Sequence, residues 1–241
     1  PRSTLFPYTT LFRSSILNNI VLVESGKQYK VLTLTDCFEY DEQTYNYYGS
    51  YSFTGTKIEQ AVVTAILNVS TDDKVVVDMI KGSNEQDYSS LKTLLENNAY
   101  QVNEVSLATG DFDSNAKIAI MYAPSVDLDE KIVEKLSTWL SNDGKYGRSL
   151  IYVPTADMGE MPNLDDFLKE WGMSIDRGYV FETDESTLVS ASSPYAFTVS
   201  YGDYYKDNLK NSKIPVVVSE SHAVNITDEN TSTEIGRASC R

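Results

Sequence analysis

From residue 57 onward, helical and extended hydrophobic patterns alternate along the chain. In residues 57–69, apolar residues recur at i, i+3, i+4, i+7, i+8 and i+11, which predicts an amphipathic helix. Residues 74–80 form an apolar run rich in β-branched residues, which predicts a strand at the centre of a sheet. A second helix at 87–98 and a strand at 100–107 follow by the same criteria.

Residues 117–154 show the pattern most plainly. An apolar strand is expected at 117–122, an amphipathic helix at 127–142 and a second apolar strand at 149–154. Buried parallel strands are continuous apolar runs, and the connection between them has helical period, so this is a β-α-β unit. Gly144 follows the helix and is expected to form a left-handed cap.

The pattern weakens towards the carboxyl end. Asn163 is expected to cap a short helix that Gly172 ends, and residues 173–182 form a further strand region. Strands are also expected at 196–201 and 214–218, separated by a polar segment at 202–212. The alternation over 57–182 predicts one doubly wound α/β domain with a mostly parallel sheet, which the later strands extend or flank.

The stretch before residue 57 has a different character. Residues 19–34 predict a β-hairpin whose turn lies at 24–27. Residues 36–56 are polar, have no sustained period and are expected to form a long loop. This loop is rich in tyrosine: Tyr40, Tyr45, Tyr47, Tyr48 and Tyr51. Such tyrosines bind sugar or peptide by stacking, or they simply occupy exposed surface.

Both ends of the chain resemble translated sequencing adaptor. Leu-Phe-Arg-Ser at the start is encoded by CTC TTC CGA TCT, and the reverse complement, read in a shifted frame after a G, encodes Glu-Ile-Gly-Arg, which occurs in the tail. Residues 1–14 and 234–241 are therefore expected to be foreign and are set aside. Residues 15–56 then hold the hairpin and the tyrosine-rich loop, and residues 57–233 hold a truncated α/β domain.

Removing the ends makes the chain more acidic. The whole chain has 20 basic and 35 acidic residues, and the two ends hold four of the bases and one of the acids. The remainder therefore carries a net charge near −18. Nucleic acid and anionic membrane surfaces are disfavoured as partners, because both require clustered Lys and Arg. No apolar run long enough to cross a bilayer occurs in the sequence.

Ligands of parallel α/β sheets bind where the strands end at their carboxyl side. Those ends are expected at 81–84, 123–125 and 154–157, and they contain Ser83, Asn84 and Asp157. None has the spacing of a Gly-rich phosphate loop. Gly82 to Asn84 forms either an anion-binding nest at a helix start or an ordinary turn.

Few residues suited to catalysis or metal binding are present. Cys240 lies in the adaptor-like tail, so Cys37 is the one native cysteine, and His222 is the one histidine. A Cys37–His222 pair is sterically conceivable, but acids flank Cys37 and disfavour a thiolate. Zinc lacks ligands. The acidic clusters at 111–113, 127–130 and 165–166 either hold calcium or serve as helix caps and solvated loops.

Several short phrases, in this order, resemble the extracytoplasmic domain of GldG-type proteins, which are auxiliary components of ABC-2 transport systems. The phrases are Val63-Thr-Ala-Ile-Leu-Asn-Val69, Leu94-Leu-Glu-Asn-Asn-Ala-Tyr-Gln-Val102, Ile118-Ala-Ile-Met-Tyr-Ala-Pro124, Leu140-Ser-Asn-Asp-Gly144 and Leu168-Lys-Glu-Trp-Gly-Met173. The chain departs from the family at 81–85, where relatives often have Gly-His-Gly-Glu, and at Asp143-Gly144, where they often have Gly-Gly.

The resemblance implies a flavodoxin-like or class I glutamine amidotransferase-like fold without catalytic residues. It further implies ABC permease and ATPase partners, and anchoring at the extracytoplasmic face of a bacterial membrane by flanking helices that this fragment lacks. We therefore expect a non-catalytic accessory domain without cofactor or metal. Its expected contacts with permease or cargo are Tyr45, Tyr47, Tyr48, Tyr51, Ser83, Asn84 and Asp157. The alternatives are an amidotransferase-like or hydrolytic enzyme using Cys37, and a carbohydrate-binding module.

Overall fold

A computed structural model describes residues 20–202 and 215–226. The adaptor-like ends and most of the polar segment predicted at 202–212 lie outside the described residues. Within the chain, one compact unit comprises the described residues up to Val76 together with Ser89–Val102. A second unit comprises Val77–Tyr88 together with the described residues from Asn103 onward. Each unit is considered by itself.

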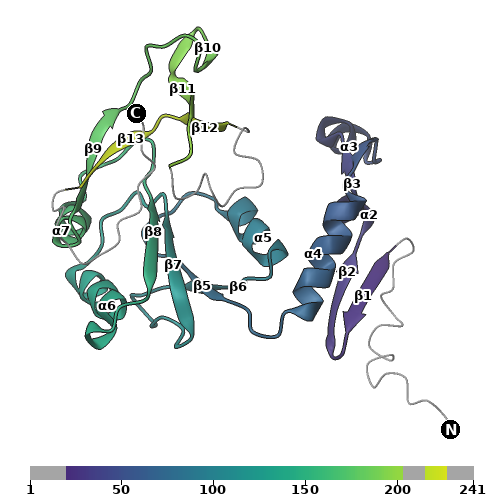
Figure 1. The fold of residues 1–241 in the computed structure, drawn as a ribbon, viewed down its shortest axis with the longest axis horizontal. Coiled ribbons are helices and arrows are strands. Elements are labelled where there is room, and N and C mark those ends of the chain that lie inside the picture. The colour runs from purple at the N-terminus through teal and green to yellow at the C-terminus, as the bar shows by residue number, and fades with distance from the viewer. Residues whose placement is uncertain (1–19, 203–214, 227–241) are drawn as a thin grey trace. The chain divides into compact units, whose positions relative to one another are not determined.

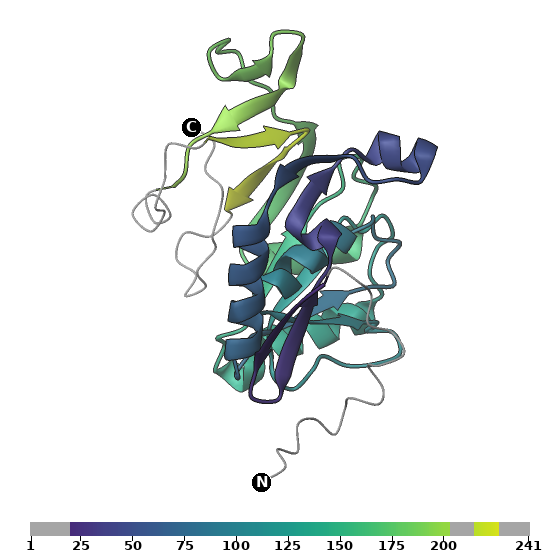
Figure 2. The same cartoon turned by 90° about the vertical axis from the view of Figure 1, so that its right-hand side faces the viewer.

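The first unit begins with the predicted hairpin, which is confirmed. Strands β1 (Val21–Ser25) and β2 (Gln28–Leu32) pair antiparallel, and Gly26 occupies the turn with φ +61°. Helix α4 (Ile58–Ser70), also predicted, lies along this hairpin (Figure 1 and Figure 2). The helix buries its small residues Ala61 and Ala65 against Leu32, which allows a close approach of helix and strands.

The predicted loop at 36–56 is wrong, because four short elements occupy it. They are α2 (Leu34–Cys37), β3 (Phe38–Tyr40), α3 (Glu42–Tyr48) and β4 (Phe53–Thr56). Strands β3 and β4 pair antiparallel, and α3 lies in the connection between them. Elements of three to seven residues are too short to show a hydrophobic period, so the pattern could not predict them.

Helix α5 (Ser89–Asn97) completes the first unit and contacts α4. The buried Asn68 of α4 donates hydrogen bonds from Nδ2 to the carbonyl oxygens of Thr64 and Asn97, at 3.1 Å each. A buried amide must find such partners, because leaving its hydrogen bonds unmade costs free energy. The bond to Asn97 ties the carboxyl ends of the two helices together.

The second unit is built around a four-stranded parallel sheet of order β6-β5-β7-β8 (Figure 1). These strands are β6 (Gln101–Val105), β5 (Val76–Ile80), β7 (Ala116–Tyr122) and β8 (Ser149–Val153). Strands β7 and β8 run parallel from Ile118 opposite Ser149 to Tyr122 opposite Val153, with helix α6 (Glu130–Ser141) between them. The predicted β-α-β unit and the α/β class are confirmed. Every residue of β5 is buried, as expected for a central strand.

The end of α6 differs from the prediction. Asn142, with φ +47°, is the left-handed C-cap, and Asp143 and Gly144 also have positive φ. Asparagine tolerates the left-handed region better than most residues do, and the Asn142 side chain donates to the carbonyl oxygen of Tyr146 at 3.0 Å. Gly144 therefore continues the turn within a short 3-10 element, η1 (Asn142–Gly144), rather than capping the helix.

Helix α7 (Pro162–Glu170) is present, but Asn163 does not cap it. The carboxylate of Asp127 accepts hydrogen bonds from the backbone N–H groups of Asn163 (3.0 Å) and Leu164 (3.1 Å). The cap thus comes from a residue 36 positions away along the chain. The predicted apolar face of α7 is confirmed, because Leu164, Phe167 and Leu168 are buried.

The later strands form separate sheets rather than extending the parallel one. Strand β9 (Met173–Tyr179) pairs antiparallel with β13 (His222–Ile226), which the sequence did not predict. A three-stranded antiparallel sheet of order β10-β11-β12 joins β10 (Leu188–Ser190), β11 (Ser193–Val199) and β12 (Val216–Ser219). Part of the strand predicted at 214–218 lies outside the described residues.

Candidate interaction surface

The loop after β5 forms the nest of backbone N–H groups that the sequence suggested, and the chain fills this nest itself. The Glu85 carboxylate accepts from the N–H groups of Gly82 at 3.1 Å and Ser83 at 2.7 Å. A carboxylate in this position satisfies the donors that an external phosphate or sulfate would otherwise satisfy. The loop is therefore closed by its own side chain.

Ser83 and Asn84 connect neighbouring strand-end loops. Ser83 is buried, so its side chain does not offer a contact at the surface, and its carbonyl oxygen accepts from the N–H groups of Ser125 and Val126 at 3.0 Å each. Asn84, in the left-handed region with φ +54°, donates from its side chain to the Ser125 hydroxyl, which in turn donates to the Asn84 carbonyl at 2.9 Å. These residues hold the loops after β5 and β7 together.

Asp157 lies in the loop after β8 and accepts a hydrogen bond from the Tyr179 hydroxyl at 3.0 Å. That hydrogen bond raises the pKa of Tyr179, because it stabilises the neutral phenol beside a carboxylate. The His222 ring stacks on Tyr179 with centroids 5.3 Å apart, and its Nε2 lies 3.2 Å from the Thr155 carbonyl oxygen and 3.1 Å from that of Ala156. His222 thus joins β13 to this loop, which agrees with a structural role.

The predicted tyrosines lie in the first unit, on the segment from β3 to β4, which we call the β3–β4 segment (residues 38–56). Asp41 is the N-cap of the segment's helix α3: its carboxylate accepts from the N–H groups of Gln43 (2.9 Å) and Thr44 (3.2 Å) and so satisfies backbone donors that the helix leaves unpaired. The Thr44 hydroxyl also donates to this carboxylate at 3.0 Å, and these hydrogen bonds, above all the two from Thr44, hold the pKa of Asp41 below its ordinary value. Gly49, with φ +67°, ends the helix.

Aromatic rings form a continuous stack along one side of this segment. Tyr45 stacks on Tyr51 with centroids 4.6 Å apart, Tyr51 stacks on Phe53 at 5.9 Å, and Phe53 contacts Phe38 at 5.2 Å. Tyr40 meets Tyr51 edge to face at 5.0 Å. The side-chain hydrogen bond with Tyr45 raises the pKa of Tyr51. The sequence identified the tyrosines, but not Phe38 and Phe53, which the pairing of β3 with β4 adds.

Two of the predicted tyrosines stand apart from this stack. Tyr47 and Tyr48 are 82% and 72% exposed, and they meet each other edge to face with centroids 4.7 Å apart. Helix α3 buries none of its residues. Large aromatic groups left in water cost free energy that contact with a partner recovers, so these two rings are the most accessible contact area of the segment.

The other predicted chemistry finds little support in the described residues. Cys37 is 7% exposed and packs with Leu32, Ala61 and Ala65 in the apolar core of the first unit, whereas His222 belongs to the second unit. In the part of the chain that the structure describes, no group of three or more His, Cys, Asp or Glu residues could hold a metal ion. The acids instead cap helices and pair with bases, as Asp127 does for α7 and Asp111 does with Lys135 at 2.9 Å.

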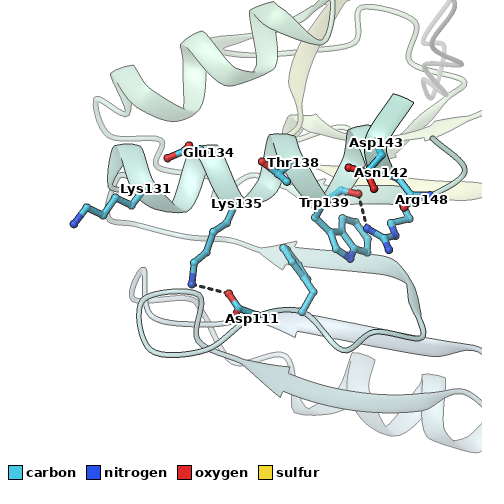
Figure 3. Close-up of a pocket in the computed structure, with 10 residues that line it drawn as sticks. Asp111, Lys131, Glu134, Lys135, Thr138, Trp139, Asn142, Asp143 and Arg148 are labelled. Carbon is cyan, nitrogen blue, oxygen red and sulfur yellow. Dashed lines mark hydrogen bonds and ion pairs between the residues drawn. The ribbon is translucent and has the colours of Figure 1, made fainter. Parts of the chain in front are cut away.

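An open pocket of about 640 Å³, which the sequence did not indicate, lies beside α6. Figure 3 shows the residues that line it. Two of its basic groups, Lys135 and Arg148, have partners: Lys135 Nζ donates to the carbonyl oxygens of Leu107 (2.9 Å) and Gly110 (2.8 Å). Arg148 lies 5.3 Å from the ring centroid of Trp139 and donates to its carbonyl oxygen at 2.9 Å. The pocket mixes both signs of charge: Asp111, Phe112, Lys131, Glu134, Lys135, Thr138, Trp139, Asn142, Asp143 and Arg148 line it.

Comparison with known proteins gives little to set beside this geometry. No family model matches the chain, and no curated protein matches it. Among solved structures, the chain is similar to one described as the mmIFT52 N-terminal domain, with 12% sequence identity, a TM-score of 0.49, and coverage of 64% of this chain and 69% of that one.

Over residues 20–202 and 215–226, none of the helices has both the length and the apolar character needed to cross a bilayer.

Proposed function

We propose that this chain is a non-catalytic accessory domain of an ABC-type transporter, which binds permease or cargo through the β3–β4 segment. The observation that carries the proposal is the exposed pair Tyr47 and Tyr48 on a helix that buries nothing. The assignment to a transporter rests on the resemblance of the sequence to GldG-type proteins. In this proposal the parallel sheet belongs to a doubly wound, flavodoxin-like or amidotransferase-like domain.

The strand-end loops support a scaffold role for the second unit. Their polar groups form hydrogen bonds with one another. Glu85 accepts from the backbone N–H groups of the loop after β5, and Asn84 donates to the loop after β7. Asp157 accepts from the Tyr179 hydroxyl. A catalytic face would present unpaired donors, acceptors or nucleophiles to a substrate. Here those groups hold the loops in place, so binding is assigned to the first unit.

The arrangement of the rings does not favour the carbohydrate alternative. A sugar-binding platform needs open aromatic faces, whereas Tyr45, Tyr51 and Phe53 cover one another's faces by stacking. The exposed rings of Tyr47 and Tyr48 meet edge to face, so they do not form one flat platform. The enzyme alternative required a reactive Cys37, and burial among apolar side chains keeps its thiol away from a substrate.

A test of the proposal requires a variant that lacks the central part of the β3–β4 segment, including α3, but keeps the rest of the fold. The Asp41 N–H donates to the Ser52 carbonyl at 2.9 Å, so these residues face each other at the end of the β3–β4 pair. Replacing residues 42–51 with Asn-Gly would close a two-residue hairpin between them. In the complete transporter, we expect this variant to lose transport while circular dichroism shows that the domain remains folded.

The complete gene is needed to express the full transporter for this test, and its sequence provides an independent check of the proposed function. We expect apolar segments of about 20 residues on both sides of this domain, and genes for an ABC ATPase and permease beside it or within it. Unchanged transport in the hairpin variant would remove the role of the segment. A complete gene with no transporter components nearby would remove the assignment to a transporter.

A further inference from the structure

The β3–β4 segment contains acids but no bases. Its acids are Glu39, Asp41 and Glu42, and Asp36 precedes them in α2; residues 31–56 as a whole contain no Lys, Arg or His. All four acids are exposed, and within the described part of the chain none of them takes part in an ion pair. The nearest bases along the chain are Lys30 and Lys57, at its two ends. The surface around the exposed rings is therefore anionic.

We propose that the partner of this surface is a protein segment that presents arginine and lysine side chains. The inference rests on the proposed function, whose partner it defines by chemistry. A cation placed over a tyrosine face is attracted by the ring quadrupole, and nearby carboxylates strengthen its binding. Arginine fits best, because its planar guanidinium both stacks on aromatic faces and pairs with carboxylates.

The short helix α3 carries acids at its start and the exposed rings at its end. Glu42 lies in the first turn of α3, three residues before Tyr45 and therefore on the same helix face. Asp41 remains ionised at neutral pH, since hydrogen bonds from Thr44 stabilise its carboxylate. Tyr47 and Tyr48 follow in the last turn of the same helix, five and six residues after Glu42 and on other helix faces, so the carboxylates attract a cation bound at this pair through the charge of the whole segment rather than by direct contact. Glu39, whose carboxylate lies against Gly55, adds charge from the neighbouring strand.

Charge also rules against other occupants of this surface. A second copy of the chain, with a net charge of −15, would bring its own acids towards these acids. Anionic lipid surfaces and nucleic acid are repelled for the same reason. A neutral glycan would gain nothing from the four carboxylates. A basic protein segment gains from both the carboxylates and the rings.

The test uses the full chain and a capped peptide of alternating glycine and arginine, titrated by calorimetry. Capped peptides that carry glutamate or serine in place of arginine are the controls. We expect the arginine peptide to bind, the other two not to bind, and affinity to fall as salt rises from about 50 mM to about 500 mM. Removing both exposed rings, with Tyr47→Ala and Tyr48→Ala, should weaken binding about tenfold.

Matched variants distinguish binding at the β3–β4 segment from a general attraction of the basic peptide to an acidic chain. Glu42→Gln should weaken binding about threefold. The exposed Phe181→Ala and Glu185→Gln, both in the second unit, remove the same kinds of group elsewhere and should leave the affinity within about twofold. Circular dichroism should show that all variants fold.

Absence of binding, or equal losses from the two sets of variants, would overturn the basic-partner proposal. Transport that still depends on the segment would then leave the proposed function standing, with a partner of different chemistry.

Discussion

Asp78, in the middle of the central strand β5, is fully buried and accepts a hydrogen bond from the Asn103 side chain at 3.0 Å. Its second carboxylate oxygen accepts from the backbone N–H of Asp113 at 2.8 Å. One buried side chain thus joins β5 to its neighbour β6 and to the loop before β7. Burial of a carboxylate is tolerated only when such partners replace water.

Asp78→Ala should lower the free energy of unfolding by about 3 kcal/mol, because the donors of Asn103 and Asp113 lose their acceptor inside the protein. Urea unfolding of the full chain would measure the change. Asp73→Ala, at an exposed position four residues before β5's Val77, is the control and should change stability by less than about 0.5 kcal/mol. Equal effects of the two substitutions would contradict the role of Asp78.

Asp127→Ala should destabilise the protein by about 1 kcal/mol, the usual cost of removing a helix cap. The physical reason is that the N–H groups of Asn163 and Leu164 would lose their acceptor at the start of α7. Asp129 provides a close control, since it is the N-cap residue of α6 but makes no side-chain cap hydrogen bond. If Asp129→Ala cost as much as Asp127→Ala, the contact between Asp127 and α7 would not matter.

Tyr152 should make the protein sensitive to alkali. Its buried hydroxyl has no hydrogen-bond partner among the described residues, and burial, together with the charge of Asp165, raises the pKa of Tyr152 to about 12. An unfolded tyrosine ionises near pH 10 (about its reference value), so the unfolded chain releases this proton first. The contribution of Tyr152 is therefore complete below about pH 10 and is lost progressively between about pH 10 and about pH 12.

Tyr152→Phe tests that dependence. At neutral pH it should change stability by less than about 0.5 kcal/mol, because no hydrogen bond is lost. Above about pH 10 the variant should become progressively more stable than the parent chain. Tyr146→Phe, at an exposed position, serves as the control for tyrosine ionisation in general. Parallel pH profiles for the parent chain and Tyr152→Phe would contradict the account.

Cys37 should react slowly with iodoacetamide at neutral pH while the protein is folded, because it is buried in the apolar core of the first unit. The experiment needs a Cys240→Ser background, since Cys240 is the other thiol in the chain. Labelling should become as fast as that of a free cysteine only on unfolding. Rapid labelling of the folded protein would revive the enzyme alternative.

The sequence predicted the elements whose patterns are long enough to repeat. Helices α4 and α6 and strands β5, β7 and β8 follow from apolar stripes and runs that local chain geometry imposes. The short elements of the β3–β4 segment offered no period, although Asp41 and Gly49 mark the start and end of α3 as typical cap residues.

Long-range partners could not be predicted in the same way. Asn163 looked like a cap because its residue type suits one, but Asp127 reaches α7 through the fold. The pairing of β9 with β13 and the filling of the nest by Glu85 depend likewise on three-dimensional approach. Composition indicated the tyrosines, whereas their division into a stacked group and an exposed pair required the structure.

The central claim is that the exposed tyrosines of α3 contact a transporter subunit. The most direct measurement places a photo-reactive phenylalanine analogue at position 47 of the complete protein, with position 181, another exposed aromatic residue, as the control. The account predicts that irradiation in cells cross-links position 47, but not position 181, to the permease or its cargo. Cross-linking that is absent from position 47, or equal at both positions, would contradict it.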